Sequence, residues 1–402
     1  GNHTGVCGRL ACELHARLEE MQSKGVHWQP SPQAGTSTLL IVDRSVDWIP
    51  LLLHDMHYEA LLHDVLSSSC VSFEEGRFVY VDRVAGAEQG RTVVLGDARD
   101  SLWETCRHKP IWEVNDLVTA EITTWTQRDA EMRRPAPANS VSQRVSTTLN
   151  TLQSIPEHKD RFDRLQLHLD ICQKCLDVIE SQMLVDIGAL EQDLATGLDR
   201  EGCRLSPRAV EKELLQHLHN PQLDSSVKAR LLLLFLSSAE GAGCPDSKHR
   251  ELASHLAAAD QRLPFSPGLI AAPRPEQKEV EKRRLSFQER CRGAGSPRTQ
   301  RLRRWQPRVR RLIEELARGA LDAREFPEYR KSRVHSSSSA RPGLTAGASA
   351  QARTVTIFVI GGVTLPEVRA AHEAALALGI DVFVGGSCML TPGALMSALR
   401  SL

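Results

Sequence analysis

The 402-residue chain has few aromatic residues, no net charge and no long apolar run. Only 4% of its residues are aromatic, while leucine and alanine are abundant, which favours a helix-rich α or α/β protein over an all-β one. Lysine and arginine number 50 and aspartate and glutamate 50, so global electrostatics favour neither nucleic acid nor a membrane surface. The longest strongly apolar run, 231–236, is far shorter than the roughly 20 residues that span a bilayer. We therefore expect no transmembrane segment.

Cysteine is also sparse. Ten irregularly spaced cysteines are too few for a disulfide scaffold and suit thiols in a reducing cytosol. The one CxxC pair, Cys172 and Cys175, lies in an expected helix without a second pair, so core or surface thiols are favoured over zinc ligands. For His54, His57 and His63 we favour solvent-facing or capping roles over a metal site. No cofactor or metal is expected, and no leading segment resembles a signal peptide.

Strand-like segments lie near both ends of the sequence. Three short apolar runs predict buried strands, at 39–43, 354–360 and 381–384. Helices are expected after them, at 51–66, 366–378 and 392–402. A strand–helix–strand–helix run requires a parallel sheet with helical crossovers, and the helix at 51–66 would pack on the first strand. The sequence therefore predicts one discontinuous α/β domain made from both ends of the chain.

The middle of the chain has a different pattern. Residues 77–82 and 91–95 alternate across a Gly-containing turn and predict a hairpin. Helical spacing then dominates, with helices expected at 111–133, 141–154, 160–196, 208–219 and 226–237, and outside this region at 8–24 and 307–318. The compositions of 265–300 and 331–353 are typical of disorder. The fold class is therefore α/β plus α, with a large, mainly helical domain inserted into the parallel-sheet domain.

Charged residues end the first strand. Asp43, Arg44 and Asp47 could mark a ligand site, because ligands bind at the carboxyl ends of parallel strands. One alternative function is therefore a nucleotide-binding enzyme that uses the strand ends near Asp43 and Gly361. However, Gly361-Gly362 lacks the GxGxxG pattern and a Walker lysine, which favours a tight turn. We interpret the three charged residues as a scaffold that ties this strand end to its neighbours.

A basic segment precedes the second group of strands. Residues 271–311 contain 14 Lys/Arg and 4 Glu, which could contact nucleic acid. They include two aromatic residues, Phe287 and Trp305, which offer little base stacking. A solvated linker leading into the helix at 307–318 is favoured, and no nucleic-acid partner is expected.

Six segments, in order over nearly the whole chain, carry a resemblance to a known family. They are Asp43-Arg44-x-x-Asp47 with Leu53-His54 and Ala60; Leu102-Trp103 with Arg107-His108-Lys109 and Glu113-Val114; Leu167-His168-Leu169; Glu191-Gln-Asp-Leu-Ala195-Thr-Gly197; Arg304-Trp305-x-Pro307; and Ile360-Gly361-Gly362-Val363 with Glu367 and Leu390-Thr391-Pro392. Together they resemble the Sec-one/Munc-eighteen (SM) family of syntaxin-binding proteins, and its exocytic branch most.

The resemblance implies an arch of three domains, of which this chain would contain the second and third and lack the amino-terminal one. On this basis the first part of the split α/β domain covers 1–68, and the inserted helical domain covers 69–187 and 188–300. The second part of the α/β domain covers 301–402, including the Ser/Gly/Ala-rich loop 331–353. A helical hairpin within about 120–187 would help to template SNARE assembly.

The family resemblance also implies the function. The chain would be a non-enzymatic regulator that binds a syntaxin-type SNARE and assembled SNARE bundles, controlling vesicle docking and fusion in exocytosis. It would be cytoplasmic and peripheral at the plasma membrane or secretory vesicles. Our partner-contact candidates are Arg107, His108, Lys109 and Glu113, with internal ion pairing as the alternative. The structural signature of the family would be Asp43, Arg44, Asp47, Gly361, Gly362, Thr391 and Pro392.

Overall fold

A computed structural model describes the chain in several segments. They are residues 5–25, 37–66, 71–74, 77–82, 91–97, 100–133, 141–199, 202–238, 247, 251–252, 254, 302–329 and 354–400. The chain divides into two compact units, which we describe separately. Unit 1 comprises Gly1–Leu52, Ile270–Pro273 and Trp305–Leu402, and unit 2 comprises Leu53–Leu269 and Arg274–Arg304. The stretches 265–300 and 331–353, for which the sequence predicts disorder, lie outside the described residues.

Unit 1 is built on a parallel sheet from both ends of the sequence. Its elements are α1 (Val6–Ser23), β1 (Ser37–Asp43), two 3-10 turns (Arg44–Val46 and Ile49–Leu51), α13 (Arg308–Ala317), β5 (Thr354–Ile360), β6 (Val363–Thr364), α14 (Leu365–Leu378), β7 (Asp381–Gly386), β8 (Met389–Leu390) and α15 (Pro392–Arg400). The strand order is β1-β5-β7, with Leu40 opposite Ile357 and Ile357 opposite Val384. The three predicted strands and their parallel pairing are confirmed.

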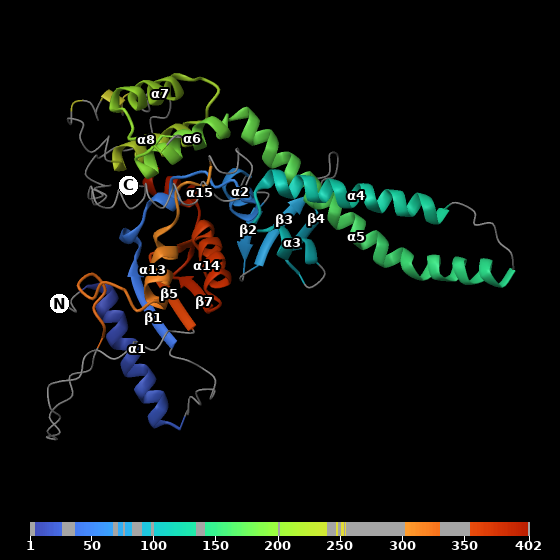
Figure 1. The fold of residues 1–402 in the computed structure, drawn as a ribbon, viewed down its shortest axis with the longest axis horizontal. Coiled ribbons are helices and arrows are strands. Elements are labelled where there is room, and N and C mark those ends of the chain that lie inside the picture. Colours follow the sequence, from blue (N-terminus) through green and yellow to red (C-terminus); the bar gives the residue numbers. More distant parts are fainter. Residues whose placement is uncertain are drawn as a thin grey trace. The chain divides into compact units, whose positions relative to one another are not determined.

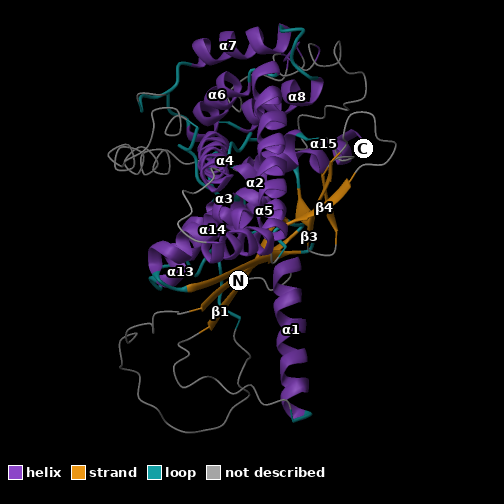
Figure 2. Ribbon diagram, turned by 90° about the vertical axis from the view of Figure 1, so that its right-hand side faces the viewer, coloured by secondary structure: helices purple, strands orange, loops and turns teal. Residues whose placement is uncertain are grey.

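Side-chain alternation along the strands builds the core of unit 1. Leu40 and Val42 of β1 are buried on one face, together with Val355, Ile357 and Val359 of β5. This face packs against the buried residues of α13 and α14, which lie on the same side of the sheet (Figure 2). A period of two places alternate strand residues on opposite faces, which explains the pattern.

Unit 2 combines an antiparallel sheet with long helices. Its elements are α2 (Tyr58–Val65), β2 (Val71–Glu74), β3 (Arg77–Asp82), β4 (Arg91–Leu95), α3 (Ser101–Cys106), α4 (Ile111–Arg133), α5 (Val141–Ser181), α6 (Leu184–Thr196), α7 (Pro207–His219) and α8 (Ser225–Ser237). The predicted hairpin of β3 and β4 is confirmed. The sequence analysis missed β2, which extends this sheet on the other side of β3, with Val71 opposite Tyr80.

Three helix predictions differ from the structure in unit 2. A break was expected between 154 and 160, but α5 continues through Pro156. The break occurs instead before α6, where Met183 adopts a left-handed conformation with φ 51° that was not predicted. The helix expected at 51–66 is the shorter α2, which belongs to unit 2 and packs against α4 and α5 rather than on β1 as predicted.

The carboxyl-terminal part of unit 2 packs around α6, which is buried over most of its length. His54 is buried beside Glu191 of α6. Its ring Nδ1 lies 2.7 Å from Glu191 Oε1, and its backbone N–H donates to Oε2 at 2.8 Å. His57 is also buried, beside Asp55. Of the predicted solvent-facing or capping roles, the solvent-facing one is wrong for these two histidines, because both are buried. His57 does occupy the N-cap position of α2, without a side-chain capping hydrogen bond. None of the described helices is long and apolar enough to cross a bilayer.

Candidate partner-binding surface

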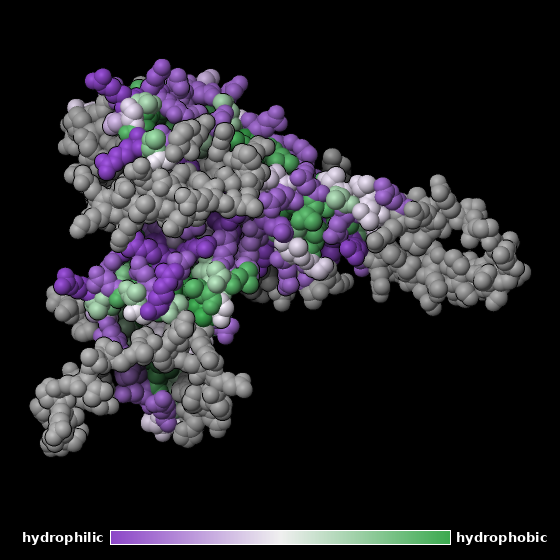
Figure 3. All heavy atoms as spheres, viewed as in Figure 1, coloured by the Kyte–Doolittle hydropathy of each residue, from purple (hydrophilic) through white to green (hydrophobic). Residues whose placement is uncertain are grey.

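The helices α4 and α5 form a long antiparallel hairpin within unit 2 (Figure 1). Val114 and Val118 of α4 and Leu165 and Ile171 of α5 are buried, which gives each helix an apolar stripe. Farther along, Trp125 stacks on Phe162 with ring centroids 4.6 Å apart. Figure 3 shows hydrophilic residues over much of the described hairpin, with apolar residues gathered where the two helices run side by side.

A buried polar network fixes α5 against α2 and the start of α3. The Tyr58 hydroxyl donates to His168 Nδ1 at 2.8 Å, and His168 Nε2 donates to Asp100 at 3.1 Å. Burial would raise the pKa of Asp100, but the bonds from His168 and from the backbone N–H groups of Gly96 and Trp103 hold it below its ordinary value. The network is fully buried at its centre, so it specifies one position for the base of α5.

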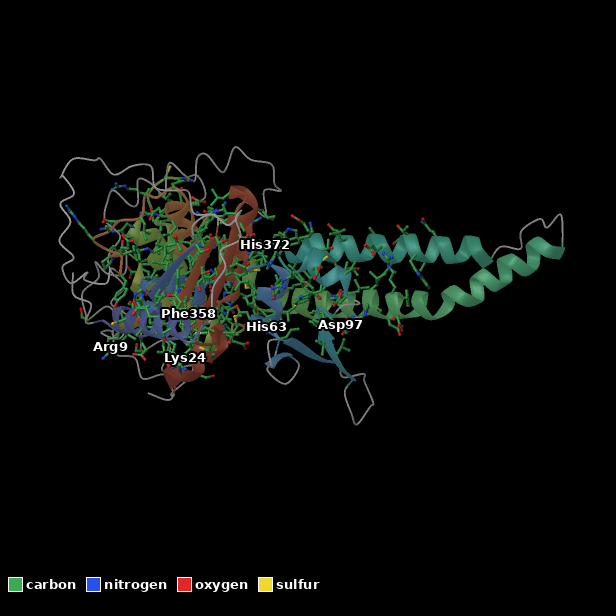
Figure 4. All side chains as sticks on the ribbon, turned by 90° about the horizontal axis from the view of Figure 1, so that it is seen from below. Arg9, Lys24, His63, Asp97, Phe358 and His372 are labelled. Carbon is green, nitrogen blue, oxygen red and sulfur yellow. The ribbon has the colours of Figure 1, made fainter. Side chains whose placement is uncertain are left out.

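Asp97 adds a second link at this end of the hairpin (Figure 4). Its carboxylate accepts a hydrogen bond from Arg164 Nη2 of α5 at 2.8 Å. Arg161, farther along α5, pairs with Glu121 of α4 at 3.1 Å. The Asp97–Arg164 contact thus joins α5 to the loop after β4, and the Glu121–Arg161 pair joins α4 to α5.

The turn before α4 contains three of the four predicted contact residues. Arg107 Nε donates to Glu59 Oε2 of α2 at 3.0 Å, and His108 Nδ1 lies 3.7 Å from the same oxygen. Lys109 lies in the same turn. Glu113 is exposed in the first turn of α4. The structure therefore groups Arg107, His108 and Lys109 in one turn, while their contact role stays a prediction.

Glu59 was not singled out from the sequence. It is buried, with 2% of its surface exposed, although it is a carboxylate in a short helix. Burial raises its pKa to about 7, and the attraction and hydrogen bond of Arg107 limit the rise. The apolar spacing of 51–66 gave no signal of a buried acid, because the residue that faces it is 48 positions away.

The predicted signature residues lie in unit 1, where β1 ends. Arg44 is buried and donates from both terminal nitrogens to Glu367, at 2.7 and 2.6 Å. Asp47 accepts from the backbone N–H of Arg308 at 2.9 Å, at the start of α13. Asp43 differs, because its carboxylate accepts a hydrogen bond from the nearby Ser45 N–H at 3.0 Å. Arg44 and Asp47 thus connect separate segments, whereas Asp43 caps the local 3-10 turn.

The predicted glycines are required by close packing. Gly361 and Gly362 have φ of 93° and 102°, which favour glycine. A Cβ on Gly361 would lie 3.0 Å from Arg44 Cβ, and one on Gly362 would lie 2.6 Å from Leu390 Cγ. The strand ends near Asp43 and Gly361 are therefore filled by the chain itself. This filling argues against the nucleotide-site alternative.

The last signature pair, Thr391 and Pro392, begins α15. Thr391 Oγ1 accepts from the Ala394 N–H at 3.2 Å, and Pro392 is the first residue of the helix. These residues shape a helix start.

The described residues offer no metal centre. No group of three His, Cys, Asp or Glu within them could hold an ion. Cys172 and Cys175 are buried free thiols, so of the predicted core or surface positions the structure shows the core. Where the basic segment is described, Arg304 pairs with Asp193, Arg308 with Glu325, and Arg310 with Glu373. Those arginines therefore have protein partners.

Comparison with known proteins gives a consistent result. The sequence model described as the Sec1 family matches residues 1–398. The chain is 27% identical over 399 residues to protein transport protein sec1 of Schizosaccharomyces pombe, covering 95% of this chain and 55% of that protein. It is 23% identical over 426 residues to SNARE-interacting protein KEULE of Arabidopsis thaliana, covering 92% and 61%.

Solved structures share the fold. The Unc18–syntaxin 1 complex from Monosiga brevicollis matches with a TM-score of 0.68 and 22% identity, covering 99% of this chain and 66% of that one. The SM protein Vps45 in complex with the Qa SNARE Tlg2 (1–310) matches with a TM-score of 0.69 and 17% identity, covering 99% and 64%. The chain spans 55% and 61% of the two curated relatives named above.

Proposed function

Because the chain belongs to the Sec1 family, we propose that it is a SNARE regulator. It binds a syntaxin-type Qa SNARE and assembled SNARE bundles, and it controls vesicle docking and fusion in exocytosis. The observation that carries this proposal is the family match over residues 1–398. One relative is named a SNARE-interacting protein, and two similar structures are complexes with a syntaxin or a Qa SNARE.

The proposed mechanism is conformational and not catalytic. A helical partner lies along the α4–α5 hairpin, and binding favours one of its conformations. The fixed base of the hairpin supports this mechanism, since a pre-organised surface loses less entropy when the partner binds. Arg107, His108, Lys109 and Glu113 are the proposed contacts, because they lie where the hairpin begins.

We also assign the two units to the family arch. The split α/β domain, with parts at 1–68 and 301–402, would consist mainly of unit 1. The inserted helical domain, at 69–187 and 188–300, would consist mainly of unit 2, although unit 2 already begins at Leu53. The parallel pairing of β1 with β5 supports this assignment, since it joins the two ends of the sequence in one sheet. The protein would act in the cytoplasm, at the plasma membrane or secretory vesicles, through its SNARE partner.

A pull-down tests the proposal. The chain is immobilised and offered the cytosolic region of a syntaxin-type Qa SNARE, an assembled SNARE bundle, or an unrelated four-helix bundle as control. The same assay is run on the chain extended by an amino-terminal domain of the family. We expect retention of a SNARE species and none of the control. If neither form retains any Qa SNARE or SNARE bundle, the proposed function is wrong.

A further inference from the structure

We propose that Glu59 is a positioning residue. It orients Arg107 so that Arg107 and Lys109 together bind a carboxylate of the helical SNARE partner. This inference rests on the proposed function and names the chemistry by which the partner is recognised at this turn.

The backbone of the turn is docked on the start of α2. The N–H of Tyr58 donates to the carbonyl oxygen of Lys109 at 2.9 Å, and the N–H of Glu59 donates to that of Arg107 at 3.1 Å. These donors have no acceptor within their own helix, because they lie in its first turn. The Lys109 N–H also donates to the Cys106 carbonyl at 2.8 Å. The turn is therefore fixed before any partner arrives.

The two partners of the ion pair between Glu59 and Arg107 differ in their exposure to solvent. The Glu59 side chain is 3% exposed and accepts a hydrogen bond from Nε of Arg107, whose side chain is 31% exposed. Among the described residues, neither terminal nitrogen of Arg107 makes a hydrogen bond. A buried carboxylate thus holds one edge of the guanidinium and leaves the edge formed by Nη1 and Nη2. That edge matches a carboxylate with two parallel hydrogen bonds.

The local charge favours an anion. Within the part of the chain that is described, the Lys109 ammonium makes no ion pair. The buried Glu59 carboxylate has Arg107 Nε at 3.0 Å and His108 Nδ1 at 3.7 Å. His63, one turn further along α2, adds no charge, because burial lowers its pKa to about 4. The turn thus presents Arg107 and Lys109 between two exposed acids, Glu104 and Glu113, and a partner carboxylate would bind between the two cations.

The alternative role for this turn, internal ion pairing alone, explains fewer of these contacts than anion binding does. It explains the contact at Arg107 Nε but not the open edge formed by Nη1 and Nη2, which has no hydrogen-bond partner among the described residues. An arginine held by a buried acid, with its second edge open, is a pre-organised receptor for an anion.

A double-mutant cycle tests this inference. Glu59→Gln, Arg107→Gln and the double variant are titrated with the Qa-SNARE cytosolic region at pH 8, where Glu59 is ionised. Glu104→Gln, an exposed acid in α3, is the matched control. We expect Arg107→Gln to weaken binding about tenfold and Glu59→Gln about fivefold, whereas Glu59→Gln adds nothing in the Arg107→Gln background. Thermal unfolding of each variant separates binding from folding.

A zero-length carbodiimide cross-link gives a second readout. It joins an amine to a carboxylate that touches it, so we expect Lys109 to couple to an acidic residue of the SNARE. Equal losses from Glu59→Gln in both backgrounds, or no loss at all, would overturn the inference while the proposed function stands. An absence of Lys109 coupling in a bound complex would also overturn it. If the wild-type chain binds no SNARE, the proposed function fails first and the inference fails with it.

Discussion

Arg44 and Glu367 form a buried two-point ion pair although they lie 323 positions apart in the sequence. The same Glu367 carboxylate accepts hydrogen bonds from the N–H and the hydroxyl of Thr364, which caps α14. One carboxylate thus connects the end of β1 to the start of the helix that covers the sheet. The pair holds the two distant parts of unit 1 together.

Removing one partner of this pair should destabilise the chain strongly. Glu367→Gln leaves the Arg44 guanidinium buried without its anion, so the free energy of unfolding should fall by about 3–5 kcal/mol. Urea unfolding followed by circular dichroism measures the change. Arg311→Gln removes an exposed pair with Glu315 and is the control, with an expected loss under about 1 kcal/mol. Equal losses in the two variants would contradict the role given to the buried pair.

The buried acid Glu59 should make stability depend on pH. Its pKa is raised from 4.5 to about 7 by burial, so the folded state holds the proton more tightly than the unfolded chain. Its favourable contribution is therefore complete below pH 4.5 and is lost as pH rises to about 7, with a slope of at most about 1.4 kcal/mol per pH unit. Urea unfolding of wild type and Glu59→Gln at pH 5, 6, 7 and 8 isolates this contribution. If the free energies of unfolding of wild type and Glu59→Gln change with pH in the same way, Glu59 does not titrate between pH 5 and 8.

The Tyr58 hydroxyl should contribute more than a surface hydroxyl. Tyr58→Phe leaves His168 Nδ1 buried without its donor, which should cost about 1–3 kcal/mol of unfolding free energy. Tyr329→Phe removes a hydrogen bond to the sulfur of Cys12 near the surface and should cost under about 0.5 kcal/mol. Thermal unfolding compares the two. A smaller loss for Tyr58→Phe than for Tyr329→Phe would disprove the importance of the buried network.

Two glycines with positive φ should respond differently to alanine. A Cβ at Gly362 would lie 2.6 Å from Leu390 Cγ, so Gly362→Ala adds a clash to backbone strain and should cost about 3 kcal/mol or more. Gly379 has φ 63° and open space around it, so Gly379→Ala should cost about 1 kcal/mol. Chemical unfolding measures both losses. If the two losses are equal, the close contact between position 362 and Leu390 does not add to the cost of the substitution.

Local sequence pattern was sufficient for β1, β5 and β7 of the parallel sheet, for the hairpin of β3 and β4, and for most helices, but not for β2, β6 and β8. The run 354–360 is rich in branched and apolar residues and is followed by Gly361-Gly362, and β5 has the predicted bounds. The helix boundaries near Pro156 and Met183 were wrong for a physical reason. A proline inside a long helix can be tolerated when the helix is supported elsewhere, and the left-handed conformation at Met183 has no signal such as glycine.

The polar contacts could not be predicted, because they join residues far apart in the sequence. Arg44 could be recognised as a charged strand end, but nothing local identifies Glu367 as its partner. Glu59 was hidden in an apolar helical pattern, and its importance follows only from the turn at Arg107. The sequence resemblance located that turn, and the structure supplied its geometry.

Calorimetric titration of the wild-type chain with a syntaxin-type Qa-SNARE cytosolic region tests the central claim most directly. The family assignment and the fixed α4–α5 hairpin predict saturable binding with a defined stoichiometry. They also predict that Arg107→Gln weakens this binding, while Glu104→Gln leaves it unchanged. A flat titration, both for the chain alone and for the chain extended by an amino-terminal domain of the family, would contradict the account.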